Sequence, residues 1–515
     1  MRKVKFGLPR TGGLLLVTVV CAWGGFAVTP SESAQPIRDK AVGVLATTTQ
    51  RASASSANVP AAISPISPIS PISPIGPIER HMRSLQARFD QLEPTRRAWI
   101  STDWDAARAS ARGKDLEVQG KPLEASSAEN SSEPITGSPL PLASVDPLFG
   151  LAIAVKDNID VAGFATTAGS RSLRFNRPRD NATVVSRLSK RGVIIVGKTN
   201  LDTFARGVRS KSEIRGTTAN AWNAARAAGG SSGGSAVAIA AGMADAALGT
   251  DTCGSLRYPA TYNGVYSLRP SAGMLSRHGI VPLSPTQDVV GPMASTPNIL
   301  RELFLAMVGA DPLDPSTKGA KLLSADGTKN SYRVGVLQGF GAYVRDAQGH
   351  SPLDTLRNSG VELVPVTLPI GVANASLIDA EGDAAIARFR SWNQLDPNSR
   401  GIAPWLQTLW KPTSNTRWKA HRSQQLRNAK LMTDLLIRER LDALTYPTTR
   451  FSATAIGAAQ PSANCWLSAA SGLPVLAVPG GFDTKKFPTV GIDLLGQTGA
   501  ELTLLTLAEK VAANQ

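Results

Sequence analysis

Short apolar runs alternate with helix-like segments through the middle of the 515-residue chain. From Leu148 the sequence reads LAIAV, then TVVSRLSKRG, then VIIVG, so strand-like and helix-like patterns follow one another at short intervals. This alternation predicts an α/β fold. The strand-like segments PVLAVPGGF (474–482) and VGIDLLG (490–496) return near the end, and we therefore expect one domain over about 79–515.

The segment 1–27 has the pattern of a secretory signal peptide. A basic stretch precedes an apolar core and small residues, and cleavage is predicted after Ala27, with a site near Ala34 as the other option. The apolar run is shorter than the roughly 20 residues of a spanning helix. We expect an exported protein, periplasmic or secreted; the alternative is an uncleaved segment that anchors the chain to a membrane.

Residues 35–78 form a predicted linker that is rich in Ser, Pro and Ile. It ends in ISPISPISPISPIGPI, where proline at every third position predicts an extended, semi-rigid spacer. From Glu79 to about Lys114 apolar residues recur at three- and four-residue spacing, which predicts helix. A serine-rich polar stretch over 125–138 follows before the strand-like runs begin.

The chain is basic, with a formal net charge of +16 and a pI near 10. Net charge bears on solubility and association rather than on fold. No RNP-like, zinc-finger or helix-turn-helix pattern accompanies the charge, so no nucleic-acid partner is expected.

The cysteines and histidines give no pattern of a metal site or a disulfide framework. The three cysteines are Cys21, Cys253 and Cys465; the first lies in the N-terminal segment and the other two are far apart in dissimilar contexts. CxxC spacing is absent, and none of the four histidines is paired at ligand spacing. We expect no metal, no cofactor and no disulfide framework.

Two segments rich in glycine and serine are candidates for a catalytic site: GGSSGGS at 229–235 and DTCGS at 251–255. Glycine is kept where the backbone bends sharply or another group comes close. A serine nucleophile also needs a base and donors for its oxyanion. Among the histidines only His278 falls near these segments, and no GxSxG elbow is present, so a Ser–His–Asp arrangement is poorly supported.

Lys156 is the other candidate base, because it ends the apolar run LAIAV and precedes DNID. Burial lowers a lysine pKa from about 10.4 by up to several units and so provides a neutral amine near pH 7. The alternative is a strand-end lysine whose ammonium reaches water. Residues 192–199, GVIIVGKT, also match a phosphate-loop expression, but the four interior residues form a strand rather than a loop, so Lys198 is expected to be structural.

Four segments together resemble the amidase signature family of serine hydrolases, from about Asp146 to Ala294. They are AVKDNIDVAGFATTAGS, VIIVGKTNLDTFA, AAGGSSGGSAVAIAAGMADAALGTDTCGSLRYPA and GIVPLSPTQDVVGPMA. The resemblance is looser in LDALTYPTT (441–449) and SGLPVLAVPGGF (471–482). It implies the amidase-signature fold, a large mixed central sheet covered by helices on both faces.

The resemblance also implies a catalytic triad of two serines and a lysine. The lysine of the VKD motif is Lys156, the bridging serine on a cis peptide is Ser231 in GGSSGGS, and the nucleophile is Ser255 in DTCGS. Ser231 would relay the proton of Ser255 to neutral Lys156 and return it to the leaving amine. Water would then hydrolyse the acyl-enzyme.

Backbone N–H groups of Thr252, Cys253 and Gly254 correspond to the family's oxyanion hole. The commoner motif has GGS where this chain has CGS, and we expect Cys253 to be a buried inert thiol, with a competing reactive thiol as the alternative. Asp251 and Arg257 flank this loop, and we expect them to pair and brace it.

These features predict a secreted or periplasmic amidase that hydrolyses a small aryl or acyl amide or a peptide C-terminal amide. The alternatives are a non-catalytic binding protein on the same scaffold and a subunit that amidates misacylated transfer RNA, against which the export segment argues. Five aromatic residues within 385–420 either line a substrate pocket or belong to the core: Phe389, Trp392, Trp405, Trp410 and Trp418.

Overall fold

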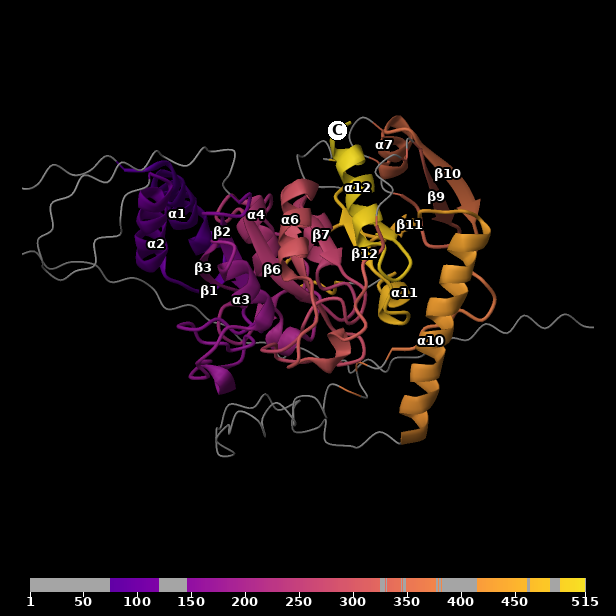
Figure 1. Ribbon diagram of the computed structural model, residues 1–515, viewed down its shortest axis with the longest axis horizontal. Coiled ribbons are helices and arrows are strands. Elements are labelled where there is room, and N and C mark those ends of the chain that lie inside the picture. The colour runs from indigo at the N-terminus through magenta and orange to yellow at the C-terminus, as the bar shows by residue number, and fades with distance from the viewer. Residues whose placement is uncertain are drawn as a thin grey trace, which may run out of the picture. The chain divides into compact units, whose positions relative to one another are not determined.

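An eleven-stranded mixed sheet carries the candidate site in the computed structural model of the protein (Figure 1). The structure describes residues 75–119, 146–324, 329, 331–343, 345, 349–376, 378, 381, 415–460, 464–481 and 491–514. The chain divides into two units, Met1–Ile72 and Ser73–Gln515, and only the second contains described residues. The predicted signal peptide, nearly all of the linker, the serine-rich stretch and four of the five aromatic residues at 385–420 lie outside the described residues.

The order of strands across the sheet differs strongly from their order in the chain. From one edge of the sheet to the other, the strands are β1 (Trp99–Thr102), β3 (Ile194–Thr199), β2 (Ala152–Lys156), β6 (Ala246–Asp251), β8 (Val289–Ala294), β7 (Tyr266–Arg269), β12 (Val475–Val478), β13 (Ile492–Leu495), β11 (Ala443–Pro447), β9 (Tyr332–Leu337) and β10 (Val361–Val366). Strand β2 pairs in parallel with β3 and β6, whereas β6 pairs antiparallel with β8. A separate two-stranded sheet joins β4 (Lys211–Ser212) to β5 (Gly216–Thr217).

Helices cover both faces of the sheet, as the resemblance implied. Those in the described residues are α1 (Pro77–Arg96), α2 (Trp104–Val118), α3 (Thr183–Ser189), α4 (Gly233–Ala240), α5 (Arg257–Asn263), α6 (Pro297–Met307), α7 (Pro352–Asn358), α10 (Asn415–Arg438), α11 (Trp466–Ala469) and α12 (Glu501–Ala512). Successive side chains of a strand point to opposite faces. On β2, Ile153 and Val155 pack with residues of α3, α6 and α12, and Ala152 and Ala154 pack with residues of α1, α2 and α4.

The strand and helix predictions around the candidate site are confirmed. LAIAV ends in β2, TVVSRLS forms α3, and VIIVG leads into β3, all with buried apolar side chains. The prediction of helix from Glu79 to about Lys114 is wrong for the middle of this segment, where a strand separates two helices. Helix α1 ends at Arg96, the next residue adopts a left-handed φ of 51°, and β1 then adds to the sheet edge by pairing antiparallel with β3.

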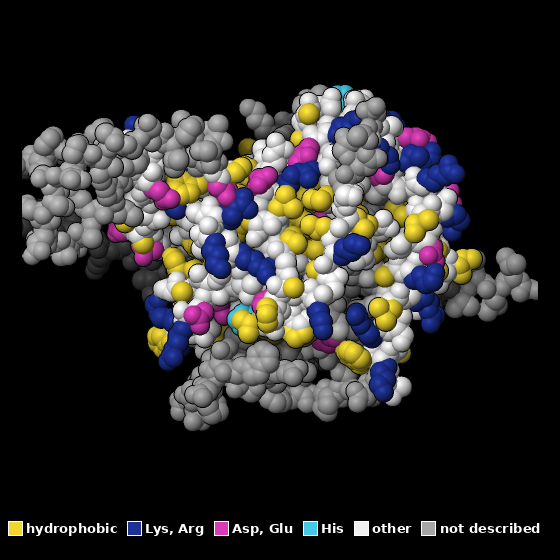
Figure 2. All heavy atoms as spheres, in the orientation of Figure 1, with side chains coloured by type: hydrophobic (Ala, Val, Ile, Leu, Met, Phe, Trp, Pro, Cys, Tyr) yellow, Lys and Arg dark blue, Asp and Glu magenta, His cyan; other side chains and the backbone are white. Residues whose placement is uncertain are grey.

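Charged side chains on the face drawn in Figure 2 are spread among uncharged and apolar ones, with Lys and Arg scattered over it. No helix among the described residues is long and apolar enough to cross a membrane. In the same part of the chain no group of three or more His, Cys, Asp or Glu side chains could hold a metal ion.

Residues 192–199 do not form a phosphate-binding loop, because they lead into and form β3. Lys198 is fully buried, and its Nζ lies 3.2 Å from the carboxylate of Asp157. Its Nζ also donates to the Thr166 hydroxyl at 3.0 Å and to the Ala165 carbonyl at 3.1 Å. The side chain is therefore engaged in the core, as the structural interpretation of this lysine predicted.

We expect Lys198→Met to lower the free energy of unfolding by about 3–5 kcal/mol, because it leaves the buried Asp157 carboxylate without its cation. Denaturant unfolding followed by circular dichroism measures the change. The double variant Asp157→Asn/Lys198→Met should recover part of the loss, since it removes both charges. A single variant as stable as the wild type would contradict the buried pair.

Candidate active site

The Lys156 amine lies at the end of the buried strand β2, in contact with a serine hydroxyl. Its side chain is fully buried, and Nζ lies 2.7 Å from the Ser231 Oγ. The same amine lies 2.7 Å from the Thr250 Oγ1 and 3.3 Å from the Thr250 carbonyl oxygen. The amine therefore has three oxygen neighbours and no carboxylate in direct contact among the described residues.

Burial lowers the pKa of Lys156 to about 7, because the low-dielectric interior disfavours the ammonium form. The negative charges of Asp202, Asp251 and Asp288 act in the opposite direction and limit the decrease. A pKa near 7 means that about half of the molecules hold a neutral amine at neutral pH. The alternative interpretation, a strand-end lysine whose ammonium reaches water, is therefore wrong.

The glycines of GGSSGGS allow the backbone to pack closely around Ser231. The peptide bond between Gly230 and Ser231 is cis, as the resemblance implied. A Cβ on Gly230 would lie 2.2 Å from the Asp202 carboxylate, and one on Gly234 would lie 2.4 Å from the Ala98 carbonyl oxygen. Side chains at either position would clash, so the turn requires glycine there.

Residues 209–211 also contact the segment that contains the cis peptide. The Asp202 carboxylate accepts hydrogen bonds from the backbone N–H groups of Arg209, Ser210 and Lys211 at 2.7–3.1 Å. The Ser210 hydroxyl in turn donates to the Ser231 carbonyl at 3.1 Å and accepts from the Gly233 N–H at 2.7 Å. These contacts fix the orientation of Ser231 toward Lys156.

Ser255 lies in the loop between β6 and α5, next to the glycine-rich turn. The Ser232 N–H donates to the Ser255 carbonyl at 3.1 Å, which joins the two segments through their backbones. The side chain of Ser255 is 5% exposed, and its hydroxyl makes no hydrogen bond to the described residues. The fold thus brings the segments of Ser231 and Ser255 into contact and joins Ser231, but not Ser255, to Lys156 by a side-chain hydrogen bond.

A buried carboxylate at the end of β6 holds the Ser255 loop. Asp251 accepts from the Gly254 N–H at 2.8 Å and the Leu256 N–H at 3.2 Å. Its oxygens also contact the Arg257 Nε at 3.1 Å and the Arg269 Nη1 at 2.8 Å. Burial alone would raise the pKa of Asp251, but the two guanidinium groups hold it well below its usual range. The predicted pairing of Asp251 with Arg257 is confirmed.

Two of the three predicted oxyanion donors have no acceptor in the part of the chain that the structure describes. Within the described residues, the N–H groups of Thr252 and Cys253 make no hydrogen bond, whereas that of Gly254 is already donated to Asp251. The Thr252 hydroxyl donates to the Asp288 carboxylate at 2.5 Å, which ties the start of the loop to the residue before β8. Of the three predicted donors, those of Thr252 and Cys253 are therefore free of acceptors among the described residues.

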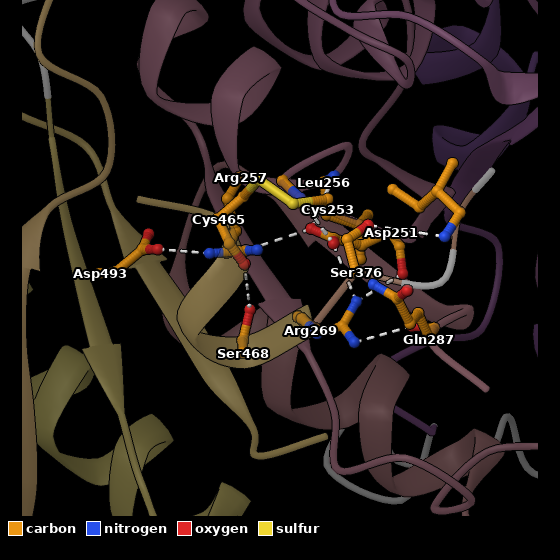
Figure 3. The surroundings of a disulfide bond; sticks show 12 residues. Asp251, Cys253, Leu256, Arg257, Arg269, Gln287, Ser376, Cys465, Ser468 and Asp493 are labelled. Atoms are coloured by element: carbon orange, nitrogen blue, oxygen red, sulfur yellow. Dashed lines mark hydrogen bonds and ion pairs between the residues drawn. A yellow bond between two sulfur atoms is a disulfide. The ribbon is translucent and has the colours of Figure 1, made fainter. Parts of the chain in front are cut away.

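Cys253 is not a free thiol, and the expectation that the two distant cysteines stay unpaired is wrong. Cys253 and Cys465 form a disulfide across 212 residues, with their Cα atoms 5.0 Å apart (Figure 3). The sulfurs meet where Cys465, the N-cap residue of α11, packs with Tyr258 and Tyr262 of α5, and Cys253 packs against the same cluster. Sequence separation alone gave no indication of this proximity.

Two cavities lie near the site, and one of them adjoins the start of the loop that carries Ser255. One of about 350 Å³ is lined by Thr250, Thr252 and Asp288 and has apolar walls at Val281 and Leu283. A second cavity of about 610 Å³ lies beside the 202–213 segment. Its lining includes Asp202, Arg206, Val208, Arg209 and Gln460.

Thr250 and Asn158 are polar contacts of the site that the sequence analysis missed. The Asn158 side-chain amide donates to the Thr250 Oγ1 at 3.1 Å, and this oxygen also contacts the Lys156 amine. The sequence did offer one indication of these contacts. Asn158 lies two residues after Lys156, in KDN, and Thr250 lies immediately before DTCGS, in GTD. Two other residues considered in the sequence analysis make contacts elsewhere. The His278 ring lies 3.5 Å from the Thr183 hydroxyl, and the Trp418 Nε1 donates to Glu381 at 2.8 Å.

The arrangement of the sheet and helices is that of structurally known amidases. The peptide amidase from Stenotrophomonas maltophilia superposes with a TM-score of 0.71 and 29% identity, over 85% of this chain and 93% of that chain. A glutamyl-tRNA(Gln) amidotransferase subunit from Thermotoga maritima superposes with a TM-score of 0.64 and 25% identity, over 85% and 92% of the two chains.

Sequence comparison gives the same family. A family model described as Amidase matches residues 127–505. The corresponding glutamyl-tRNA(Gln) amidotransferase subunit of Chloroflexus aurantiacus is 33% identical over 464 residues, which cover 82% of this chain and 90% of that protein. The chain belongs to the amidase signature family of carbon–nitrogen hydrolases.

We expect the stability difference between the wild type and Lys156→Met to depend on pH. Between a folded pKa near 7 and an unfolded pKa near 10.4, the unfolded state binds the extra proton. Raising the pH therefore stabilises the folded wild type, by about 2 kcal/mol between pH 7 and pH 9. The methionine variant lacks this contribution, so urea unfolding of both proteins at the two pH values isolates it. Parallel pH dependences would contradict the lowered pKa.

Proposed function

We propose that the protein is an exported amidase that hydrolyses a small or peptidic amide through an acyl-enzyme on Ser255. The observation that carries the proposal is the 2.7 Å contact between the Lys156 amine and the Ser231 hydroxyl, in a fully buried setting. A hydroxyl becomes a nucleophile when a neighbouring base takes its proton. Here the base is an amine whose pKa lies near 7.

The contacts of Lys156 support a neutral amine as the proton acceptor. A neutral amine has two N–H groups and one lone pair. The carbonyl oxygen and the hydroxyl of Thr250 accept the two N–H groups, and the lone pair then faces the Ser231 hydroxyl. Ser231 passes its proton to Lys156 as it takes the proton of Ser255. The reverse transfer protonates the leaving amine.

The Ser255 loop supplies donors for the oxyanion. Donors that are already in place stabilise charge that develops only in the transition state. The N–H groups of Thr252 and Cys253 are available for this role, and the carboxylate of Asp251 orients the loop through the N–H of Gly254. Water then attacks the acyl carbon, and the returning proton frees Ser255.

Two features support export. The segment 1–27 has the pattern of a signal peptide. Independently, the Cys253–Cys465 disulfide is of a kind that persists in the periplasm or outside the cell and is rare in the cytosol.

The second candidate function is that of a component in transfer-RNA amidation. Relatives named as a subunit of glutamyl-tRNA(Gln) amidotransferase match most of the chain, which favours this alternative. Such a component would act with partner proteins, whereas an amidase would act alone.

We expect the purified chain by itself to release ammonia or amine from a panel of primary, aryl and peptide C-terminal amides. Ser255→Ala and Lys156→Met should each lower kcat/KM by at least about 10⁴-fold, because nucleophile and base act as a unit. Lys198→Met is the matched control, since it removes the neighbouring buried lysine and should affect stability but not the turnover of folded enzyme. Full activity in Lys156→Met, or turnover only with added partner proteins, would contradict the proposal.

We expect the full chain to leave the cytoplasm of a bacterial host and to be cleaved after Ala27. Cell fractionation and mass determination of the mature N-terminus measure both, with cleavage after Ala34 as the second acceptable product. A variant with Leu14→Arg and Val17→Arg in the apolar run is the control and should stay in the cytoplasm. Cytoplasmic wild-type protein would favour the transfer-RNA alternative.

A further inference from the structure

We infer that the Cys253–Cys465 disulfide is a positioning element of the active site, which holds the oxyanion donors of the Ser255 loop. This inference rests on the proposed function. It states that the enzyme turns over its substrate at full rate only while the bond is oxidised, so that catalysis depends on the redox state of the compartment. Cys465 acts through Cys253 and touches no reacting atom.

The bond joins the catalytic loop to a distant part of the chain. Cys253 lies two residues before Ser255, and Cys465 is the N-cap residue of α11. In Figure 3 the sulfur bridge lies beside the buried network of Asp251, Arg257 and Arg269. The Ser255 loop is thus held by Asp251 at one point and by α11 at another.

The α11 end of the bond is firmly anchored. Cys465 is 6% exposed, and its carbonyl accepts from the Ser468 hydroxyl at 3.2 Å. The preceding residue, Asn464, donates from its side chain to the Pro447 carbonyl at 2.6 Å and the Phe340 carbonyl at 3.1 Å. The disulfide therefore ties the loop to a segment that cannot shift without breaking buried hydrogen bonds.

The loop end of the bond is held by hydrogen bonds on either side of Cys253. The Gly254 N–H donates to the Asp251 carboxylate at 2.8 Å, and the Thr252 hydroxyl donates to the Asp288 carboxylate at 2.5 Å. The N–H of Cys253 has no acceptor among the described residues, and packing against Val208, Tyr258 and Tyr262 is non-directional. The disulfide restrains the side chain of Cys253, whose N–H is proposed to meet the oxyanion, in addition to the hydrogen bonds made by its two neighbours.

Loss of the bond should act on kcat. Oxyanion donors work only in the transition state, so a looser loop lowers kcat and changes KM little. Cys253 is partly exposed whereas Cys465 is buried, so we expect a thiolate to attack the bond from the side of Cys253. Reduction by dithiothreitol breaks the S–S bond, transfers two electrons and two protons to give the thiols of Cys253 and Cys465, and leaves the reductant as its cyclic disulfide.

The test uses the full chain with Cys21→Ser, which leaves Cys253 and Cys465 as its only cysteines. Kinetics on an amide that the oxidised protein hydrolyses are measured before and after dithiothreitol and normalised to the titre of active Ser255. Free thiols are counted in denatured samples, and circular dichroism checks the fold. We expect no free thiol per chain before reduction and two after it. Reduction should lower kcat at least tenfold and change KM by less than twofold. Reoxidation should restore kcat.

Cys465→Ser and Cys253→Ser give the same test without a reductant. Each should have the low kcat of the reduced protein and be insensitive to dithiothreitol, whereas Cys21→Ser alone should behave as the wild type. A reduced protein with two free thiols and unchanged kcat per titrated site overturns the inference, even if its melting temperature falls. Two free thiols in the active oxidised protein also overturn it. An oxidised, folded protein that hydrolyses no amide overturns the proposed function and this inference with it.

Discussion

The geometry of the site depends on one buried carboxylate. Asp251 ends β6 and accepts hydrogen bonds from two N–H groups of the Ser255 loop, while Arg257 and Arg269 balance its charge. Arg257 extends the network to β13 through Asp493 at 2.5 Å. A buried charge without partners is strongly destabilising, so each member requires the others. The Ser255 loop is therefore built into the core of the sheet.

Two buried lysines on neighbouring strands show how the surroundings set the chemistry of a side chain. The register pairs Lys156 with Thr199 and Val155 with Lys198, so the lysines project from opposite faces of the sheet. Lys198 meets the Asp157 carboxylate, whereas Lys156 meets oxygens of Ser231 and Thr250. The first is an ion pair of the core. The second has a pKa of about 7 and suits proton transfer.

The scaffold does not by itself select a substrate. Proteins named as a peptide amidase and as part of a transfer-RNA amidotransferase both superpose on this chain. A shared fold supports many activities, and the site and its surroundings distinguish them. In this chain the distinguishing features are the N-terminal segment and the disulfide beside Ser255, and the proposal of export rests on these two features.

The sequence by itself determined the α/β class and the strands around the site, and it placed Lys156, Ser231 and Ser255 in motifs that resemble those of one family. These follow from periodicity over a few residues and from motifs read along the chain. Only the tertiary structure decided that Cys253 pairs with Cys465, that Thr250 and Asn158 surround the amine, and that the Gly254 N–H is already used. Each of these depends on segments that approach one another only when the sheet assembles in an order unlike that of the chain, and no local pattern records that approach.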